Sequence, residues 1–270
     1  MQEGHVEFVG AFAHPFALKS LCAFLGWPQA TWEQLHGWTH GNQEASLARN
    51  REEGARLARE FTGYVVQELN RRRAAEPAAP DDITTSLMRT RIDGQPLSDE
   101  DIVSILRNWT AGQGTVSGGI EILVWHLAQF PDVQKRLREN PELIGAAVDE
   151  ILRTDGPLVA NRRTATNDVE IGGRQIPRDA KLTLMWIAAD RDPDAFQKPY
   201  QIQLDRDQAD NLLFGQGIHY CLGAPLARLE MRIALEELLS QTSTITFGPT
   251  SPRRAVYPSN GFHSLPIQVS

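Results

Sequence analysis

Cysteine is scarce in this sequence: only Cys22 and Cys221 occur among 270 residues, and they lie far apart. Two distant cysteines cannot form the dense disulfide framework of a small secreted domain, so we expect a reducing compartment. No apolar run approaches the roughly 18 residues that a membrane-spanning helix needs. The charged residues between Met1 and Gly10 argue against a signal peptide. These absences predict a cytoplasmic protein with no membrane anchor.

Positive charge is also in short supply, since 27 Lys and Arg stand against 34 Asp and Glu, for a formal net charge of −7. A dedicated nucleic-acid binder carries an excess of positive charge, so we expect no nucleic acid among the partners. Hydrophobic residues at 41% and charged residues at 23% are typical of a globular protein. The length suits one large domain or two modest ones.

The first 155 residues are predicted to be mostly helical. Apolar side chains recur at helical spacing from Leu57 to Leu69. Arg71, Arg72 and Arg73 then close that helix at the negative pole of its dipole. Further helices are expected over residues 15–26, 81–90, 98–130, 132–138, 141–154 and 225–240.

The pattern changes after Gly156. Residues 169–171 and 175–176 flank Gly172-Gly173, which predicts a hairpin. Residues 182–189 form an apolar stretch that fits either a strand or a helix. A long loop is expected over residues 191–213.

The long helix over residues 98–130 has an unusual middle. Its start, Ser98-Asp99-Glu100-Asp101, fits a capping box. Glycine in a helix interior costs roughly 1 kcal/mol relative to alanine, so a cluster of glycines needs a reason. Two reasons carry equal weight: close packing against another helix, or passage beside a bulky flat object. The four glycines are Gly112, Gly114, Gly118 and Gly119.

Cys221 stands in a segment suited to an ionised ligand. Two glycines before it allow a tight turn, and an amphipathic helix starts directly after it. The amides and dipole of a helix N-terminus stabilise a thiolate. A lone cysteine is more often an inert apolar residue, but these surroundings favour a ligand. The segment reads Phe214-Gly215-Gln216-Gly217-Ile218-His219-Tyr220-Cys221-Leu222-Gly223.

This segment resembles the haem-binding signature of cytochrome P450, F-G-x-G-x-H-x-C-x-G, at all six fixed positions. The resemblance implies that the chain binds haem b through Cys221 as the iron ligand. His219 would approach a haem propionate, and Phe214 would pack near the sulfur. The matching glycines, which complete the predicted haem-binding segment, are Gly215, Gly217 and Gly223.

Two further segments resemble the family in the expected order. Glu150-Ile151-Leu152-Arg153 matches its E-x-x-R motif, and a spacing of three places both charges on one helix face. Taken alone, such a pair could be a surface ion pair of little energetic value. The resemblance implies a buried, structural pair that also bonds an arginine before the cysteine, for which Arg206 is the candidate. Arg163, rather than Arg162, would pair with a propionate.

The glycine-rich helix resembles the family's A-G-x-[D/E]-T, which crosses the distal haem face. Ala111 and Gly112 would then lie against the haem, and Thr115 would assist proton delivery. Gly114 stands where the family has an acid, so Gln113 or Thr115 would have to substitute through water. This departure weakens the case for ordinary oxygen activation.

Other positions follow the family's pattern less closely. Asn211 occupies the position where a histidine usually contacts a propionate, and we assign it to the haem site. Leu158, Val159 and Phe262 would contact the substrate. The segment from residue 4 to residue 28 resembles the family's D and E helices, so helices A to C have no counterpart here.

These observations predict a mainly α fold with a small β portion, a truncated P450 fold forming one haem-thiolate domain over residues 1–270. The resemblance implies a soluble, bacterial-type monooxygenase. It would insert one oxygen atom into a small hydrophobic substrate with electrons from a ferredoxin-type donor. Gly114 favours an alternative that uses peroxide or catalyses a rearrangement. The short length favours another, a non-catalytic remnant or a piece that pairs with a second chain.

Overall fold

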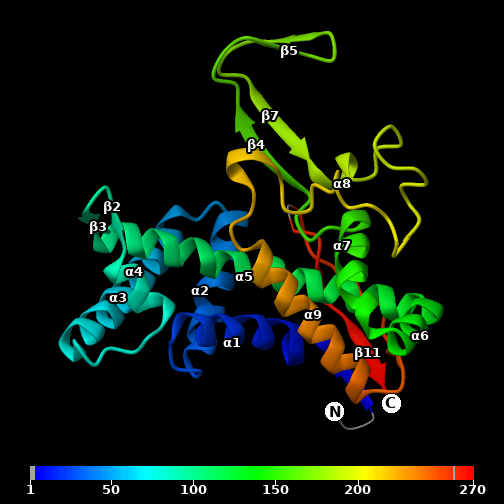
Figure 1. Cartoon of the computed structure of the whole chain (residues 1–270), viewed down its shortest axis with the longest axis horizontal. Coiled ribbons are helices and arrows are strands. Elements are labelled where there is room, and N and C mark those ends of the chain that lie inside the picture. The colour runs from blue at the N-terminus through cyan, green and yellow to red at the C-terminus, as the bar shows by residue number, and fades with distance from the viewer. Residues whose placement is uncertain (1–3, 258) are drawn as a thin grey trace. The chain divides into compact units, whose positions relative to one another are not determined.

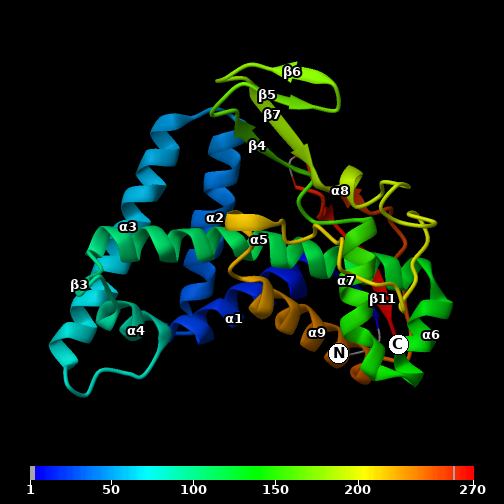
Figure 2. The same ribbon diagram turned by 45° about the horizontal axis from the view of Figure 1, so that its top comes forward.

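The computed structural model describes residues 4–257 and 259–270, and it is mainly α-helical with small β-sheets (Figures 1 and 2). This confirms the predicted fold class. The chain divides into two compact units, one of residues 10–117 and one of residues 1–9 with 118–270. The prediction of a single domain stays a prediction. In the part of the chain that the structure describes, no helix is both long and apolar enough to cross a membrane.

The unit of residues 10–117 is built from helices around an apolar core. Its core includes Leu21, Leu35, Phe61, Val65 and Leu106, all almost fully buried. The elements are η1 (Val9–Ala13), α1 (His14–Leu25), α2 (Thr31–Leu47), α3 (Arg51–Ala75), α4 (Ile83–Arg89), the strand pair β2 (Arg91–Ile92) and β3 (Gln95–Pro96), and the first part of α5 (Asp99–Gln129).

The helix ends in this unit follow local chemistry. Asn50 caps α3 by accepting the amide of Glu53 at 3.1 Å. Ser98 and Asp101 exchange the two bonds of a capping box at the start of α5, because each side chain accepts the amide of the other residue at 3.1 Å. The prediction of a long helix starting at this box is confirmed.

The unit of residues 1–9 and 118–270 combines helices with four small sheets among its described residues. Its helical elements are the rest of α5, α6 (Pro131–Glu139), η2 (Pro141–Leu143), α7 (Ile144–Thr154), α8 (Trp186–Ala189), η3 (Gly217–His219) and α9 (Ala224–Gln241). Its strands are β1 (Gly4–Glu7), β4 (Ala160–Thr164), β5 (Val169–Ile171), β6 (Arg174–Ile176), β7 (Lys181–Met185), β8 (Ile245–Phe247), β9 (Arg253–Arg254), β10 (Phe262–Ser264) and β11 (Pro266–Val269).

The strands pair antiparallel. β11 lies between β1 and β8, β4 pairs with β7, and β9 pairs with β10. The hairpin of β5 and β6 turns at Gly172-Gly173, as predicted. The side chain of Gln134 ties α6 to β8, because its amide donates to the carbonyl of Ile245 at 2.9 Å and accepts the amide of Ile245 at 3.0 Å.

Two segments differ from or refine the sequence predictions. Residues 182–189, whose type was open, divide into the end of β7 and the short helix α8. Helix α2 was not among the predicted helices, although its residues fall in the mostly helical part. Its sequence contains Gly37 and Gly41 and has little apolar periodicity.

Candidate functional site

Cys221 lies in a tight loop just before α9. Its thiol is exposed, and Gly223, two residues later, is the N-cap of that helix. The loop turns at Gly215 and Gly217, whose φ angles of +71° and +72° favour glycine. The amide of Cys221 donates to the carbonyl of Phe214 at 2.9 Å, which closes the loop. The backbone therefore holds the sulfur out at a helix N-terminus.

The neighbours of Cys221 are apolar and exposed. Ile218 is 96% exposed and Leu222 is 90% exposed, while His219 and Tyr220 are also exposed. Two large aliphatic side chains within five residues are rarely left this exposed, and such a patch marks a binding surface. The loop thus presents one sulfur atom for ligation, flanked in the sequence by exposed apolar side chains.

Arg228 fastens this loop to α7. Its guanidinium lies over the ring of Phe214, 4.4 Å from the ring centroid, and its Nε donates to the carboxylate of Asp149 at 2.8 and 3.0 Å. It also contacts the hydroxyl of Tyr220 at 3.3 Å. Sequence reasoning did not find Arg228 or Asp149. Their separation of 79 residues leaves no local pattern to detect.

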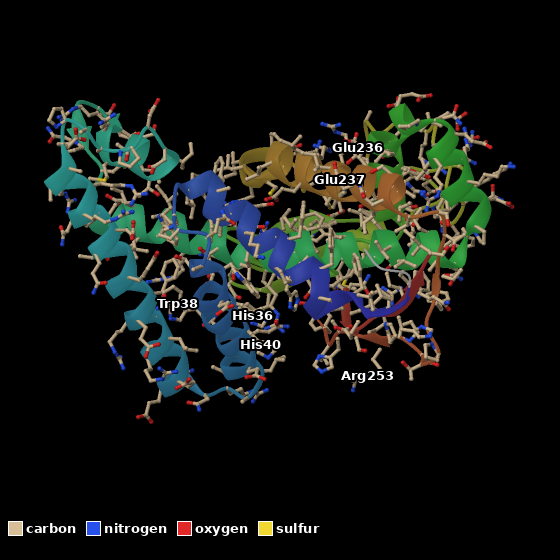
Figure 3. All side chains as sticks on the ribbon, turned by 90° about the horizontal axis from the view of Figure 1, so that it is seen from below. His36, Trp38, His40, Glu236, Glu237 and Arg253 are labelled. Carbon is tan, nitrogen blue, oxygen red and sulfur yellow. The ribbon has the colours of Figure 1, made fainter. Side chains whose placement is uncertain are left out.

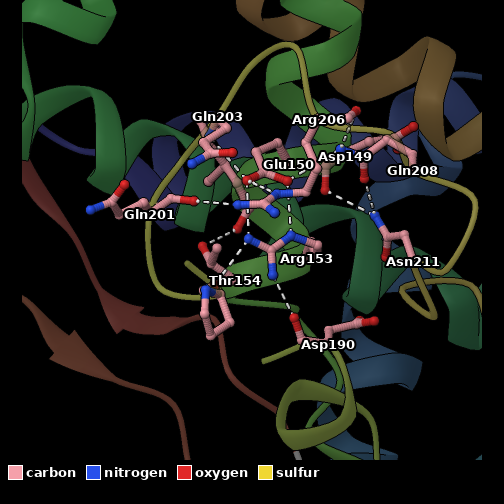
Figure 4. A network of polar contacts seen from close by, with 12 residues as sticks. Asp149, Glu150, Arg153, Thr154, Asp190, Gln201, Gln203, Arg206, Gln208 and Asn211 are labelled. Atoms are coloured by element: carbon pink, nitrogen blue, oxygen red, sulfur yellow. Dashed lines mark hydrogen bonds and ion pairs between the residues drawn. The ribbon is translucent and has the colours of Figure 1, made fainter. Parts of the chain in front are cut away.

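Glu150 is the centre of a buried polar network (Figure 4). Arg153 donates to both of its oxygens at 2.8 and 3.0 Å, and Arg206 donates to Oε1 at 2.9 Å. The amide of Gln203 and the side chain of Gln208 add bonds at 3.0 and 3.2 Å. The structure thus brings together the three residues singled out from the sequence and adds two that were not.

The charge state of Glu150 follows from these contacts. Burial alone would raise its pKa, but the hydrogen bonds from Arg153 and Arg206 and from the loop outweigh burial and lower it. Glu150 is therefore an anion at neutral pH. It stabilises the fold above its unfolded-state pKa, and that stabilisation is lost as the pH falls through its lowered pKa in the fold.

Arg153 extends the network to the long loop. It donates to the backbone carbonyls of Asp190 and Pro199, and its guanidinium lies 4.7 Å from the ring centroid of Phe196. The carboxylate of Asp190 accepts the amide of Leu212 at 2.7 Å, so both ends of the segment 190–212 are tied. Burial raises the pKa of Asp190 to about 6.

Asn211 belongs to the same loop. Its side chain donates to Gln208 at 2.8 Å and to the carbonyl of Asp149 at 3.3 Å, and it accepts the amide of Leu213 at 2.8 Å. Through these contacts the Asn211 side chain helps to order the loop and joins it to Asp149 of α7. Its predicted contact with a haem propionate stays a prediction.

Arg163 lies in β4, half-buried, with a hydrogen bond to the carbonyl of Arg162 at 2.9 Å. An open pocket in front of it is lined by side chains of the β4–β7 pair, two of them further cations. The lining residues are Arg162, Arg163, Thr164, Lys181, Leu182 and Thr183. The cationic lining suits an anionic group, and the predicted pairing of Arg163 with a propionate stays a prediction.

The glycine-rich part of α5 presents an exposed stripe. Ala111, Gly112 and Thr115 are exposed, and a Cβ added at Gly112 would meet nothing within 4 Å. Gln113 is buried and stands 200° around the helix from Ala111. The structure therefore does not bring Gln113 to the side of Thr115, so Gln113 is poorly placed to share its proton relay.

The two later glycines of the cluster have a different role. A Cβ at Gly119 would lie 2.7 Å from the sulfur of Met231, and a Cβ at Gly118 would lie 3.6 Å from the backbone of Gly261. Close packing therefore explains one part of the cluster, and passage of the other part beside a flat object stays a prediction. Gly118 and Gly119 allow close packing, whereas Gly112 and Gly114 face open space.

Two of the residues predicted to contact substrate, Leu158 and Val159, are consecutive, and the third, Phe262, is in β10. Leu158 and Val159 precede β4 and are half-buried, and Leu158 forms a β-bridge with Ser259. Phe262 is 5% exposed and packs against Trp125 and the guanidinium of Arg254. Phe262 is thus a packed side chain in this structure.

The comparison with known proteins decides the family. The family model described as Cytochrome P450 matches residues 45–255. The chain belongs to the cytochrome P450 family. Cytochrome P450 144 of Mycobacterium tuberculosis is 34% identical over 252 residues, which cover 91% of this chain and 57% of that protein. 6-Deoxyerythronolide B hydroxylase of Saccharopolyspora erythraea is 32% identical, with coverage of 91% and 60%.

Solved structures agree with this assignment. The P450 PksS of the Bacillus subtilis bacillaene polyketide synthase superposes with a TM-score of 0.92 at 30% identity, covering 100% of this chain and 70% of that one. The relatives are bacterial P450s, as the resemblance implied. The chain spans about three-fifths of the length of the curated relatives it matches, 57% and 60% of the two named.

The residues present fit the haem that the P450 family implies. The exposed sulfur of Cys221 stands between exposed Ile218 and Leu222, which suits one face of a flat apolar macrocycle. The cationic pocket at Arg163 suits an acidic substituent of that group.

Proposed function

We propose that this chain is the haem-thiolate part of a P450 monooxygenase that inserts one oxygen atom into a small hydrophobic substrate. Electrons would come from a ferredoxin-type donor. The observation that carries the proposal is the exposed thiol of Cys221, presented at the N-terminal end of α9 within the full P450 signature. Family membership supports the reaction type.

The cofactor is haem b in this proposal, with Cys221 as its iron ligand. When bound, haem supplies an iron centre for oxygen chemistry, and thiolate ligation favours O–O cleavage by pushing electron density onto that iron. Arg163 and His219 hold the propionates, with Asn211 close by, and Phe214 packs beside the sulfur. The remaining contacts come from Gly215, Gly217 and Gly223 in the loop and from Ala111 and Gly112 on α5.

The network at Glu150 has a structural role in this function. Arg206 and Arg153 fix the loop that leads to the cysteine, and Arg228 fixes the loop after Phe214. Because the loop that carries Cys221 is held in this way, it needs little rearrangement when haem binds, and less conformational entropy is lost in ordering the site.

Proton delivery is assigned to Thr115, whose hydroxyl is on the exposed stripe of α5. Gln113 remains a weaker candidate because it is buried on another side of the helix. Leu158 and Val159, which are half-buried, form the apolar substrate surface. Phe262 is the weaker candidate, because it is packed against Trp125 and Arg254. One relative is named as a hydroxylase of 6-deoxyerythronolide B, which supports a hydroxylation reaction here without fixing the substrate.

Gly114 supports a second candidate function. An acid is absent from the position next to Thr115, and peroxide already carries the two electrons and two protons that a reductase-driven cycle must deliver. A peroxide-using or rearranging haem-thiolate enzyme therefore needs this acid less. A non-catalytic chain, or one that completes its site with another chain, is the third candidate.

The absorption spectrum of the reduced protein under carbon monoxide tests the proposal. We expect the red-shifted Soret band of thiolate-ligated haem, and we expect Cys221→Ala to abolish it. Cys22→Ala is the control, because Cys22 is buried in the core and burial raises its pKa to about 11. A Cys221→Ala protein that kept the band would show that the ligand is another residue, and haem uptake without turnover would favour the third candidate.

A further inference from the structure

Asp155, the C-cap of α7, contacts both α5 and the turn between β9 and β10. The residue is 8% exposed. Its Oδ2 accepts a hydrogen bond from Nη2 of Arg254 at 2.9 Å, and its Oδ1 accepts one from Nδ2 of Asn260 at 2.6 Å. On α5, Nε2 of His126 lies 3.5 Å from Oδ2. One buried carboxylate thus joins a helix to both ends of a turn, and all of these residues lie in the unit of residues 1–9 and 118–270.

The charge of Asp155 strengthens these contacts. Burial alone would raise its pKa, but the contacts with His126 and Arg254 outweigh burial and lower it. Asp155 is therefore an anion at neutral pH. Hydrogen bonds to an ionised acceptor are roughly twice as strong as bonds between neutral groups, so the carboxylate restrains the turn at both of its ends.

Asn260 joins the turn to the segment that leads from α7 into β4. Besides its bond to Asp155, its side chain donates to the carbonyl of Gly156 at 3.0 Å. Its backbone amide donates to the carbonyl of Pro157 at 3.0 Å. Three consecutive residues of the segment therefore bind one residue of the turn, which fixes the register between them.

The next two residues of this segment are the half-buried Leu158 and Val159. Leu158 forms a β-bridge with Ser259, the residue before Asn260 in the turn. The carbonyl of Val159 accepts the amide of Trp186 in α8 at 3.0 Å. Contacts to the turn and to α8 therefore set the position of these two apolar side chains.

Arg254 holds the other end of the turn. Its guanidinium lies 4.6 Å from the ring centroid of Trp125 and 4.3 Å from that of Phe262. Successive side chains of a strand point to opposite faces, and the exposed Arg253 before it points outward (Figure 3). The amide of Phe262 donates to Oε2 of Glu121 at 2.7 Å. The turn is thus fixed against α5 where it leads into β10.

We propose that Asp155 and Asn260 are positioning residues for the substrate. By binding each other they hold the turn in place, and the turn sets the position of Leu158 and Val159. The inference rests on the proposed function, which assigns these two side chains to the apolar substrate surface. Neither positioning residue belongs to the cysteine loop or to the network in Figure 4. Changes to them should therefore alter the choice of apolar ligand and leave haem uptake intact.

Two ligands of haem iron, imidazole and 4-phenylimidazole, test this in the haem-loaded chain. Both bind iron through a ring nitrogen, and only the second carries a phenyl group that can contact the apolar surface. Titrations followed by the shift of the Soret band give the two dissociation constants, and their ratio measures the contribution of that surface. Asp155→Asn keeps the size of the side chain and removes its charge. We expect it to lower the preference for the phenyl ligand by about tenfold, comparable with the loss of one methylene contact, with no change in imidazole affinity.

Asn260→Ala is the second variant, because it leaves Asp155 paired with Arg254, and it should lower the ratio as well. The double variant that combines Asp155→Asn with Asn260→Asp exchanges acid and amide, so a hydrogen bond can form with donor and acceptor reversed. Its ratio should return to within about threefold of the parent, a recovery that a general loss of stability would not give. Asp194→Asn, at an exposed position in the loop after α8, is the control and should leave the ratio unchanged.

Equal ratios in the Asp155→Asn, Asn260→Ala and Asp194→Asn proteins, with imidazole still bound, would overturn the inference and leave the proposed function standing. A parent chain whose Soret band does not respond to imidazole would overturn the proposed function, and this inference with it.

Discussion

Arg206 donates its Nε–H to Oε1 of Glu150 at 2.9 Å, across 56 residues of sequence. Its side chain is 8% exposed, and its remaining nitrogens bond the carbonyls of Gln197, Lys198 and Gln201. One arginine thus organises the loop on one side and reaches the buried acid on the other. The position of the cysteine loop depends on this link.

Replacing Glu150 with alanine should destabilise the protein strongly. The change leaves the buried Arg153 and part-buried Arg206 without their anion, and breaking a buried pair costs roughly 3–5 kcal/mol. Urea unfolding followed by circular dichroism measures this. Glu142→Ala, at an exposed position in η2, is the control and should change stability by less than about 0.5 kcal/mol. Similar midpoints for both variants would contradict a structural role for Glu150.

Glu230 should make the fold less stable as the pH rises. It is 4% exposed, neither carboxylate oxygen has a hydrogen-bond partner among the residues that the structure describes, and burial raises its pKa to about 7. Above its unfolded-state pKa of about 4.3, the unfolded chain releases this proton while the fold retains it. Stability should therefore fall between about pH 4.3 and pH 7, by an amount of order 3 kcal/mol.

Glu230→Gln should remove this fall, because glutamine does not titrate. The measurement is the difference in unfolding free energy between variant and parent at pH 5 and at pH 7.5. Glu237→Gln, at an exposed position of the same helix (Figure 3), should give the same small difference at both values. A pH-independent difference for Glu230→Gln would mean that this carboxyl titrates normally.

The glycines of α5 should respond to alanine in opposite directions. Gly112→Ala should stabilise the chain by about 0.5–1 kcal/mol, because the new methyl meets nothing and helix propensity improves. Gly119→Ala should destabilise it, because the methyl would lie 2.7 Å from the sulfur of Met231, which must move. Thermal unfolding of the haem-free proteins separates the two. A stability change of the same sign for Gly112→Ala and Gly119→Ala would argue against the difference in packing at the two positions.

An acid at position 114 should improve coupling in the reductase-driven reaction. Gly114 cannot relay a proton, and the position is exposed, so Gly114→Glu or Gly114→Asp can be accommodated. The measurement is product formed per electron consumed, beside the peroxide-driven rate. We expect a larger gain in the first than in the second. Tight coupling in the parent protein, with no gain from the acid, would point to another proton source.

The sequence was informative about the fold where local patterns dominate. The capping box at Ser98 and the glycine pair at 172–173 each predicted an element that the structure contains. Helix α2 shows the limit of this reasoning. A Cβ at its Gly41 would lie 3.1 Å from Leu57 of α3, so this glycine serves packing between helices, which no local pattern reveals.

The candidate site was predictable to the extent that its motifs are contiguous. Cys221 and the pair Glu150 and Arg153 stand in short motifs, and Arg206 was found through the family resemblance. Gln208 and Arg228 were missed because their partners are set by the path of the loop. Gln113 was grouped with Thr115 by sequence proximity, whereas helical geometry turns it to another side.

The hydrogen bonds between Glu150 of α7 and the loop at residues 203–208 determine how the loop loses its order when contacts are removed. Closing a chain segment of 56 residues costs roughly 4 kcal/mol of entropy, and this cost is met once, however many bonds span the closure. Arg206, Gln208 and the amide of Gln203, which bond Glu150, share it with the bond from Asn211 to Asp149 and the bond from Arg153 to Pro199. Removing one of them leaves the segment closed, whereas removing the last releases the full entropy. Loss of order in the loop should therefore be abrupt. The loop should stay ordered as bonding partners are removed one at a time, and it should become disordered when the last bond that closes the segment is lost.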